Sequence, residues 1–270
     1  MTAWERRDLA TARRVVVKVG SSSISGENSG RIAVIVDALA GAHTRGTEIV
    51  LVSSGAISTG MPYLDLDLRP TDLATQQAAA AVGQNVLIYR YQDALRPFGI
   101  VAGQVLLTAG DLENTVHRSN AQRAMERLLD LRILPIVNEN DTVATHEIRF
   151  GDNDRLAALV AQLIGADALV LLSDVEALYT RPPDDPGAEP IDRIGHDDNL
   201  AGHEFGSVVV NSVGTGGAAT KVSAARLAAA SGIGVLVTAA DLVAQALAGD
   251  EIGTWFAPRP AAVTSPVDTL

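Results

Sequence analysis

The sequence predicts an α/β fold, a three-layer αβα sandwich built around an open, mainly parallel central sheet. Apolar runs of strand length alternate with longer alanine-rich segments of helical period, which is the order that βα units produce. The 270 residues are 47% hydrophobic but only 4% aromatic, so the core must consist of Ala, Val, Leu and Ile. Aliphatic residues of this kind fill parallel strands that helices cover on both faces.

Six apolar segments have the length of buried strands, and six longer segments have helical period. The expected strands are 14–19, 48–53, 100–107, 133–138, 168–172 and 234–238. The expected helices are 30–44, 72–95, 117–131, 152–164, 218–231 and 241–248. Asp72 and Asp152 are expected N-caps, because a short carboxylate accepts hydrogen bonds from the unpaired amides of a first helical turn. The proline-rich stretch 180–190 suits neither a helix nor a central strand, and we expect a linker there.

Composition excludes several classes of function. A net charge of −11 argues against nucleic acid and anionic membranes as partners, because both require a concentrated basic face. The chain has no cysteine, so it contains neither disulfides nor thiolate metal sites. Its basic N-terminus lacks the apolar stretch of a signal peptide, and Gln162 and Asp167 interrupt the most apolar segment, residues 156–173. We therefore expect a cytoplasmic enzyme without a membrane span.

Three polar or glycine-rich segments directly follow expected strands. They are GSSS at 20–23, SSGA at 53–56 and NENDT at 138–142. In open α/β sheets, ligands bind outside the carboxyl ends of the strands. The three segments together therefore predict a ligand site at that edge of the sheet.

The use of lysine is selective. Of the 21 basic side chains only Lys18 and Lys221 are lysines, and both lie beside glycines. Lysine is a compact charge with rotating donors, suited to a phosphoryl group whose charge redistributes during transfer, whereas arginine is a broad planar fork. A shared phosphate target is the functional interpretation; chance, or a lysine at a strand end that reaches solvent, is the structural one.

The loop SVGTGGAATK, residues 212–221, precedes an expected helix. Glycine amides, a threonine hydroxyl and the helix N-terminus together form a phosphate cradle. The pattern is neither the P-loop nor the dinucleotide fingerprint, and a glycine-rich loop alone also fits a flexible turn.

The segment 138–156 is rich in carboxylates and amides. Five Asp or Glu and three Asn fall within 138–154, more than helix capping requires. These carboxylates could orient the two lysines, hold a metal ion or bind the amine of a substrate. Oxygen ligands without Cys or paired His favour Mg²⁺ bridged to phosphates, and the five scattered histidines show no ligand spacing, so we expect no metal held by protein side chains alone. The serines of SSGAIS are expected to bind ligand through hydroxyls and amides, without a Ser-His-Asp set.

Taken together, these motifs resemble the glutamate 5-kinase (γ-glutamyl kinase) branch of the amino acid kinase family. The resemblance rests on KVGSSS, IVLVSSGAISTGM, LATQQAAAAVGQ, PIVNENDTVATHEIRFGDNDRLAALVA, LLSDVEALYT and VGTGGAATKVSAA, in this order. It covers residues 13–257, with 1–12 as an N-terminal extension and 258–270 as a C-terminal tail. It implies the amino acid kinase fold, ATP and L-glutamate as substrates, Mg²⁺ as cofactor, and a homo-oligomer, either dimer or tetramer.

The resemblance also implies roles for individual residues. Catalysis falls to Lys18, Lys221 and Asp154, with Asp154 holding both lysines in place. The residues expected to bind glutamate are Ser54, Gly55, Asp141 and Asn153. Those expected to bind the nucleotide are Lys18, Gly20, Ser173, Asp174, Thr215, Gly216, Gly217, Ala218, Ala219, Thr220 and Lys221. The chemistry agrees, because a γ-carboxylate is already ionised at neutral pH and needs no general base.

Three features depart from the family pattern. Glu176-Ala177 replaces the usual Asp-Gly before LYT, which puts the shape of the nucleotide loop in doubt. Residues 115–120, TVHRSN, lack the usual arginine and aromatic, which puts feedback inhibition or oligomer contacts in doubt. Many bacterial members also carry a C-terminal PUA domain, and this sequence stops before one.

Two alternatives to an active glutamate kinase stay open at this stage. The first is a related amino acid kinase with a shifted acid substrate, which the presence of Ser54, Asp141 and Asn153 disfavours. The second is a catalytically silent homologue that binds ATP or an amino acid, which the retention of Lys18, Asp154 and Lys221 disfavours.

Overall fold

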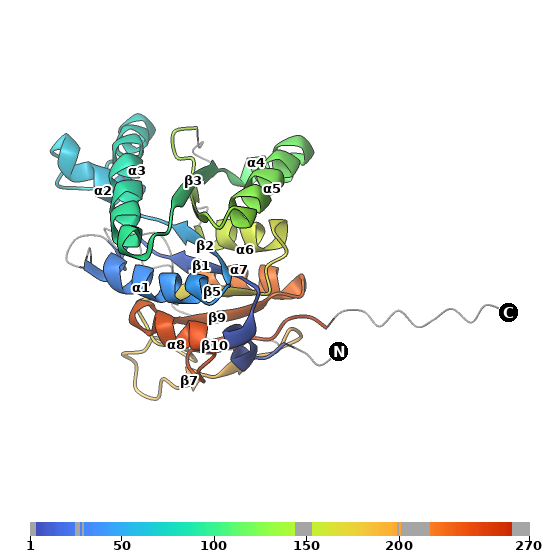
Figure 1. Ribbon diagram of the computed structural model, residues 1–270. Coiled ribbons are helices and arrows are strands. Elements are labelled where there is room, and N and C mark those ends of the chain that lie inside the picture. The colour runs from blue at the N-terminus through green and yellow to red at the C-terminus, as the bar shows by residue number, and fades with distance from the viewer. Residues whose placement is uncertain are drawn as a thin grey trace.

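The computed structural model of the chain describes residues 4–24, 28, 30–143, 153–198, 200 and 217–260. Within them, an eight-stranded sheet has the order β3-β4-β2-β1-β5-β9-β10-β8 (Figure 1). In this order the strands are β3 (Ala102–Leu107), β4 (Leu134–Glu139), β2 (Glu48–Ser53), β1 (Arg14–Val19), β5 (Ala168–Ser173), β9 (Gly234–Ala239), β10 (Thr254–Phe256) and β8 (Arg193–Ile194). The strand pairs are parallel except β9 with β10, so the predicted α/β fold with a mainly parallel sheet is confirmed.

All six expected strands and all six expected helices are present, with boundaries that shift by at most two residues. The helices are α1 (Arg31–Thr44), α3 (Leu73–Leu95), α5 (Thr115–Asp130), α6 (Asn153–Leu163), α7 (Ala218–Ala230) and α8 (Val243–Ala248). The N-cap prediction for Asp72 is confirmed, because its side chain accepts a 2.9 Å bond from the amide of Thr75. Asp152 lies outside the described residues.

The structure also contains short elements that the sequence did not predict. They are α2 (Ala56–Gly60), α4 (Ala109–Glu113), β6 (Leu178–Tyr179), β7 (Pro190–Ile191), β8, β10 and the 3₁₀ helices η1 (Arg6–Thr11), η3 (Met61–Leu64), η4 (Arg96–Phe98) and η6 (Ala240–Leu242). Strands β6 and β7 pair antiparallel and close the proline-rich stretch into a small hairpin. Elements of two to six residues carry too little periodicity to be recognised from sequence alone.

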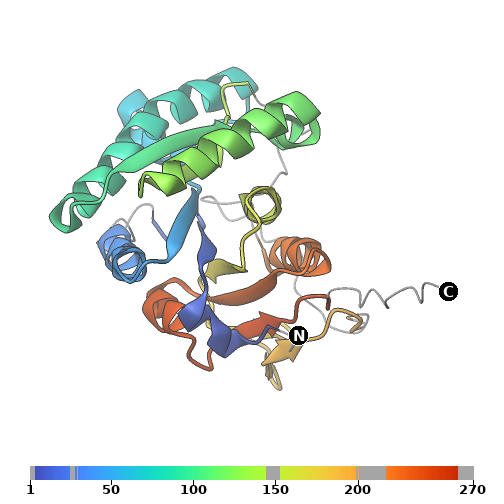
Figure 2. The ribbon, with the colours of Figure 1, turned by 45° about the vertical axis from the view of Figure 1, so that its right-hand side comes forward.

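Helices cover both faces of the sheet (Figure 2). Helices α1 and α8 lie on one face, and α6 and α7 on the other, while α3 and α5 flank the edge at β3. Two clusters of buried side chains fill the spaces between these layers, and they are mainly aliphatic, as expected, but also contain Tyr91, Trp255 and Phe256. No helix among the described residues is both long and apolar enough to cross a lipid bilayer.

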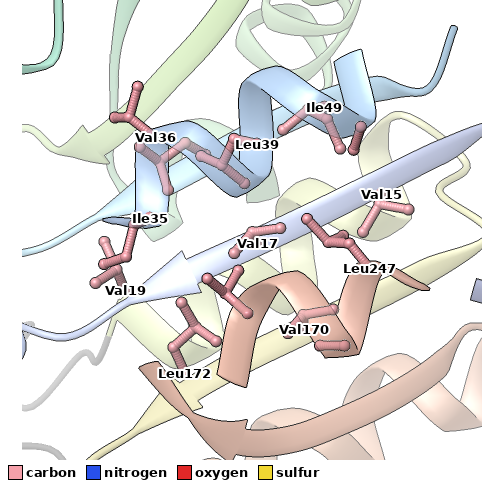
Figure 3. Packing of buried hydrophobic residues seen from close by; sticks show 14 of the residues in the cluster. Val15, Val17, Val19, Ile35, Val36, Leu39, Ile49, Val170, Leu172 and Leu247 are labelled. Atoms are coloured by element: carbon pink, nitrogen blue, oxygen red, sulfur yellow. The ribbon is translucent and has the colours of Figure 1, made fainter. Parts of the chain in front are cut away.

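Side chains along β1 alternate between the two clusters. Val15, Val17 and Val19 are buried against the layer of α1 and α8, as Figure 3 shows. Val16 belongs to the opposite cluster, which contains residues of α6 and α7. Because the side-chain period of a strand is two, Lys18 lies on the same face as Val16. This alternation aims its ammonium group at α6 and α7.

Candidate active site

The candidate site begins at the carboxyl end of β1, near the centre of the sheet. The connection after β1 carries α1 on one face, and α6, which leads into the neighbouring β5, covers the other face. The connection after β1 and the connection into β5 thus lie on opposite faces of the sheet. This arrangement leaves a crevice outside the carboxyl ends of the two strands, where α/β proteins bind ligands. The expected site residues at the ends of β1, β2, β4 and β5 all lie along this edge.

The two lysines converge on one carboxylate. Lys18 Nζ forms an ion pair with Oδ1 of Asp154, and Lys221 Nζ lies 3.3 Å from Oδ2 of the same side chain. The three side chains come from β1, α6 and α7, and all three residues are buried, with exposed fractions of 3%, 0% and 7%. A buried pair of like charges is tolerated only when a counter-charge lies between them. Asp154 provides that counter-charge.

The pKa of Asp154 shows that it stays ionised. Burial by itself would raise the pKa, but the charges of Lys18 and Lys221 and the hydrogen bonds to Lys18 and Thr220 lower it to about 2. The cluster therefore carries two positive charges and one negative charge at neutral pH. The remaining positive charge faces the ligand edge of the sheet, where it would attract an anion.

The first turn of α7 supports this cluster. Gly217 is the N-cap, and its amide donates a 3.1 Å bond to Thr220 Oγ1. The same hydroxyl lies 3.1 Å from Oδ2 of Asp154, so the turn is fixed to the carboxylate. Free amides at a helix N-terminus favour phosphate. Gly20 directly follows β1. A β-carbon on Gly20 would be 3.8 Å from Lys18 Nζ, so a longer side chain at this position would fill space beside the ammonium group.

Residues after β2 form the next part of the site. The amide of Ser54 donates a 3.2 Å bond to the carbonyl of Val19 in β1, and Gly55 follows with a φ of 89°, a conformation that favours glycine. Buried Ser53 bonds to the hydroxyl of Tyr91 at 2.9 Å, which fixes the end of β2 to α3. Burial raises the pKa of Tyr91, so the phenol stays neutral.

Asp141 and Asn153, both expected to bind glutamate, are half-buried residues on either side of a segment outside the described residues. Burial raises the pKa of Asp141 to about 6, and the charge of Arg69 only partly opposes the shift. Oδ1 of Asn153 is buried and has no hydrogen-bond partner among the described residues. Buried acceptors are normally bonded, so this Asn153 oxygen is available to a ligand donor.

Two of the residues expected to bind the nucleotide, Ser173 and Asp174, lie at the carboxyl end of β5. Ser173 ends the strand, and Asp174 accepts a 3.2 Å bond from Ser23 Oγ of the loop after β1. Ala218 and Ala219 open α7 beside Gly217. Thr215 and Gly216 lie outside the described residues.

The structure locates two of the departures from the family pattern. Ala177 is buried and does not have a positive φ, so this position needs no glycine. The flanking loop is held by a bond from Thr238 Oγ1 to the carbonyl of Glu176 and another from the amide of Leu178 to Thr254 Oγ1. Residues 115–120 form the exposed start of α5. Within the described residues, no hydrogen bond or ion pair joins them to the lysine cluster.

Sequence reasoning missed the residues of α3 and the loop before it that support the site. Tyr91 forms a hydrogen bond with Ser53, and Gln84 forms one with Asn138. The charge of Arg69 acts on Asp141. Gln84 and Tyr91 lie on the buried face of α3. A polar group on an otherwise apolar helix face is the sequence feature that could have identified them. Arg69 lies in a loop and gave no signal. No group of three or more His, Asp or Glu side chains gathers as a metal site in the part of the chain that the structure describes.

A comparison with protein families and a comparison with individual proteins point to the same family. The model of the amino acid kinase family matches residues 13–239. A glutamate 5-kinase from Leifsonia xyli subsp. xyli is 71% identical over 258 residues, covering 96% of each chain. One from Clavibacter sepedonicus is 71% identical over 96% of this chain and 100% of its own length. A glutamate 5-kinase from Salinispora arenicola is 55% identical, and this chain spans 70% of its length.

Solved structures share the fold at low sequence identity. A carbamate kinase from Giardia lamblia bound to AMP-PNP aligns with a TM-score of 0.66 at 15% identity, over 93% of this chain and 100% of its own. An isopentenyl phosphate kinase aligns with a TM-score of 0.60 at 20% identity, over 90% of this chain and 99% of its own.

Proposed function

The chain belongs to the amino acid kinase family, within it to the glutamate 5-kinases, and we propose that the Lys18–Asp154–Lys221 cluster is its phosphoryl-transfer centre. The enzyme transfers the γ-phosphoryl group of ATP to the γ-carboxylate of L-glutamate, the first step of proline biosynthesis. The observation that carries our assignment of the centre is that two buried ammonium groups share one carboxylate at the ligand edge of the sheet.

The chemistry requires little more than placement and neutralisation of charge. The attacking γ-carboxylate is ionised, so no side chain has to remove a proton. Negative charge on the phosphoryl oxygens is the main barrier, and pre-positioned cations and amides lower it. In our proposal Lys18 and Lys221 bind these oxygens from two sides, and Asp154 holds the ammonium groups in place. The cluster is buried, so little water screens its charge.

Glutamate is proposed to bind beside the ends of β2 and β4. Ionised Asp141 and Oδ1 of Asn153, which has no partner among the described residues, would accept from the α-ammonium group, which needs acceptors only. Ser54 and the backbone of Gly55 would contact a carboxylate.

The nucleotide is proposed to bind between the ends of β5 and α7. Ser173 and Asp174 would contact it, and the segment 215–221 would hold its phosphates; of these residues, 217–221 are described. Mg²⁺ is proposed to be held mainly by phosphate oxygens and water, as is usual for this ion in phosphoryl-transfer sites. Bound Mg²⁺ would neutralise charge on the phosphates.

An assay with competing acids tests the function. ADP release and hydroxamate formation would be measured with L-glutamate, L-aspartate and N-acetylglutamate. We expect turnover with L-glutamate and its loss in Lys221→Ala. Faster turnover with another acid would indicate a shifted substrate, and nucleotide binding without turnover would contradict the kinase function.

Lys18→Arg is expected to lower kcat by at least about tenfold although it preserves the charge, because a planar guanidinium cannot replace a compact ammonium. Lys18 is 3% exposed, and its pairing with Asp154 leaves no space for the larger group. Steady-state kinetics at saturating ATP and glutamate would measure the change. Arg155→Lys, an exchange at the exposed pair with Glu113, is the control and should leave kcat unchanged. Normal turnover by Lys18→Arg would show that lysine geometry is not required.

The KM for glutamate is expected to rise as the pH falls below about 6, because the pKa of Asp141 is raised to about 6 and only the ionised form binds an ammonium group. The rise should approach roughly tenfold per pH unit below that value. Asp141→Asn should bind glutamate weakly at every pH. A KM that is independent of pH between 5 and 8 in the natural enzyme would contradict the assigned role.

The raised pKa of Asp141 also affects stability. Ionisation of Asp141 favours glutamate binding but disfavours the folded state. The pKa of Asp141 in the folded state lies above the ordinary value of 3.8 for an aspartate, so the folded state binds the proton more tightly and stability falls as the pH rises from about 4 through about 6. Asp141→Asn should therefore increase the free energy of unfolding at pH 7.5, on the order of 1–2 kcal/mol. Urea unfolding at pH 7.5 would measure it.

We also infer a cytoplasmic enzyme that assembles as a homo-oligomer, with a kinase domain at 13–257 between an N-terminal extension and a C-terminal tail. Size-exclusion chromatography with light scattering tests the assembly.

A further inference from the structure

Gln84 of α3 forms a largely buried hydrogen-bond network with β3 and with the carboxyl end of β4. Its Nε2 donates to the carbonyl of Glu139 at 3.3 Å, and its Oε1 accepts from Asn138 Nδ2 at 3.3 Å and from Gln104 Nε2 at 3.2 Å. Gln84 is 8% exposed and Asn138 is 3% exposed. One amide therefore uses both its donor and its acceptor to connect a helix with two neighbouring strands.

The network fixes the orientation of the Asn138 amide. Asn138 Oδ1 accepts from the amide of Glu139 at 2.9 Å, while Nδ2 donates to Gln84. Gln84 cannot exchange its own oxygen and nitrogen, because the carbonyl of Glu139 requires a donor and the two neighbouring amides require an acceptor. Each amide in the network therefore has one satisfied arrangement.

These bonds hold the main chain just before Asp141. The carbonyl of Glu139 is bonded to Gln84, and the amide of Asn140 donates to the carbonyl of Leu107 in β3 at 3.0 Å. The turn continues with a 3.1 Å bond from the amide of Val143 to the carbonyl of Asn140. Asp141 lies inside this turn, so the position of its carboxylate depends on the anchored residues on either side.

We propose that Gln84 is a positioning residue for the glutamate site, acting through the turn that carries Asp141. The proposal rests on the proposed binding of the substrate ammonium group by Asp141. Loss of Gln84 frees the carbonyl of Glu139 and the amide of Asn138, and the turn then samples other conformations. Glutamate binding should suffer, whereas the lysine cluster and the nucleotide site, which belong to other strands, should not.

Gln92 provides a matched control in the same helix. Its Nε2 donates to the carbonyl of Ile100 at 3.3 Å, and its Oε1 accepts from the amide of Ala102 at 2.9 Å. It thus connects α3 to the beginning of β3, opposite the ligand edge of the sheet. A purely structural role for such glutamines would give the same effects at both positions.

The experiment compares Gln84→Met and Gln84→Glu with Gln92→Met and Gln92→Glu. For both Gln84 variants we expect the KM for glutamate to rise about tenfold, with the KM for ATP within about twofold and kcat within about threefold of the natural enzyme. Gln84→Glu keeps the shape and the acceptor but removes the donor, so it isolates the bond to Glu139. The Gln92 variants should lose comparable thermal stability without a change in the KM for glutamate.

Equal kinetic effects at both positions, or an unchanged KM for glutamate in folded Gln84 variants, would overturn the proposal. If Gln84→Met does not fold, Gln104→Leu decides, since Gln104 is exposed and donates only one bond to this network. We expect its KM for glutamate to rise about two- to threefold, and no rise would overturn the proposal. Activity of the natural enzyme with glutamate is measured first, so failure of the proposed function is seen independently of the variants.

Discussion

Asp154→Asn is expected to lower kcat by about 100-fold or more and the free energy of unfolding by about 3–5 kcal/mol. Asp154 is fully buried and is the shared partner of Lys18 and Lys221. Asparagine keeps the shape but leaves two buried ammonium groups without a counter-charge. These groups then repel each other, and the geometry that holds the phosphoryl oxygens is lost.

Urea unfolding and an ADP-release assay would measure the two effects. Asp167→Asn is the matched control, because Asp167 Oδ2 accepts from the amides of Arg13 and Arg14 at 2.8 and 2.9 Å, at the amino end of β1 and away from the ligand edge. It should lose some stability and keep its kcat. Near-natural kcat in Asp154→Asn would remove the cluster from the mechanism, and unchanged stability would show that the lysines do not need the carboxylate.

Gly83→Ala is expected to lower the free energy of unfolding by about 3 kcal/mol or more. Gly83 and Gly60 lie where α2 crosses α3 in backbone contact, and a β-carbon on Gly83 would overlap the carbonyl oxygen of Ala56. The backbone cannot yield as a flexible side chain would. Since α2 directly follows Ser54 and Gly55, any displacement of α2 should also raise the KM for glutamate.

Gly41→Ala in α1 tests whether this effect is local. A β-carbon on Gly41 would meet nothing nearer than the Arg45 guanidinium at 3.7 Å, so alanine should raise the stability by up to about 1 kcal/mol through its higher helix propensity. Thermal unfolding of the two variants gives the comparison. A folded, stable Gly83→Ala enzyme with a natural KM would contradict the close crossing of α2 and α3.

The long elements were predictable because their patterns are local. Strand β1 has its expected limits, and α3 begins after Asp72 as expected, because apolar period and capping chemistry act within a few residues. The strand β10 was missed, because Thr254–Phe256 is too short for a pattern and owes its place to pairing with β9 and β8.

The chemistry of the site was also readable in part. The two lysines, against nineteen arginines, singled out Lys18 and Lys221 before any geometry was known, whereas Asp154 was chosen among the carboxylates of 138–154 only through the resemblance to the family. The side chains proposed to carry the chemistry are informative by their type. Gln84 and Tyr91 bond to Asn138 and Ser53, and their only mark in the sequence is a polar group on the buried face of a helix, which does not say which residue it contacts.

By itself, the sequence determined the α/β class and the order of its main elements, since these follow from residue type and short-range period, and its motifs indicated the ligands through their resemblance to a family. Only the tertiary structure decided that Lys18 and Lys221 share one buried carboxylate, that α2 touches α3 through two glycines, and that Gln84 holds the turn before Asp141. Contacts between residues far apart in the chain depend on how helices pack on the sheet. No local pattern encodes that packing.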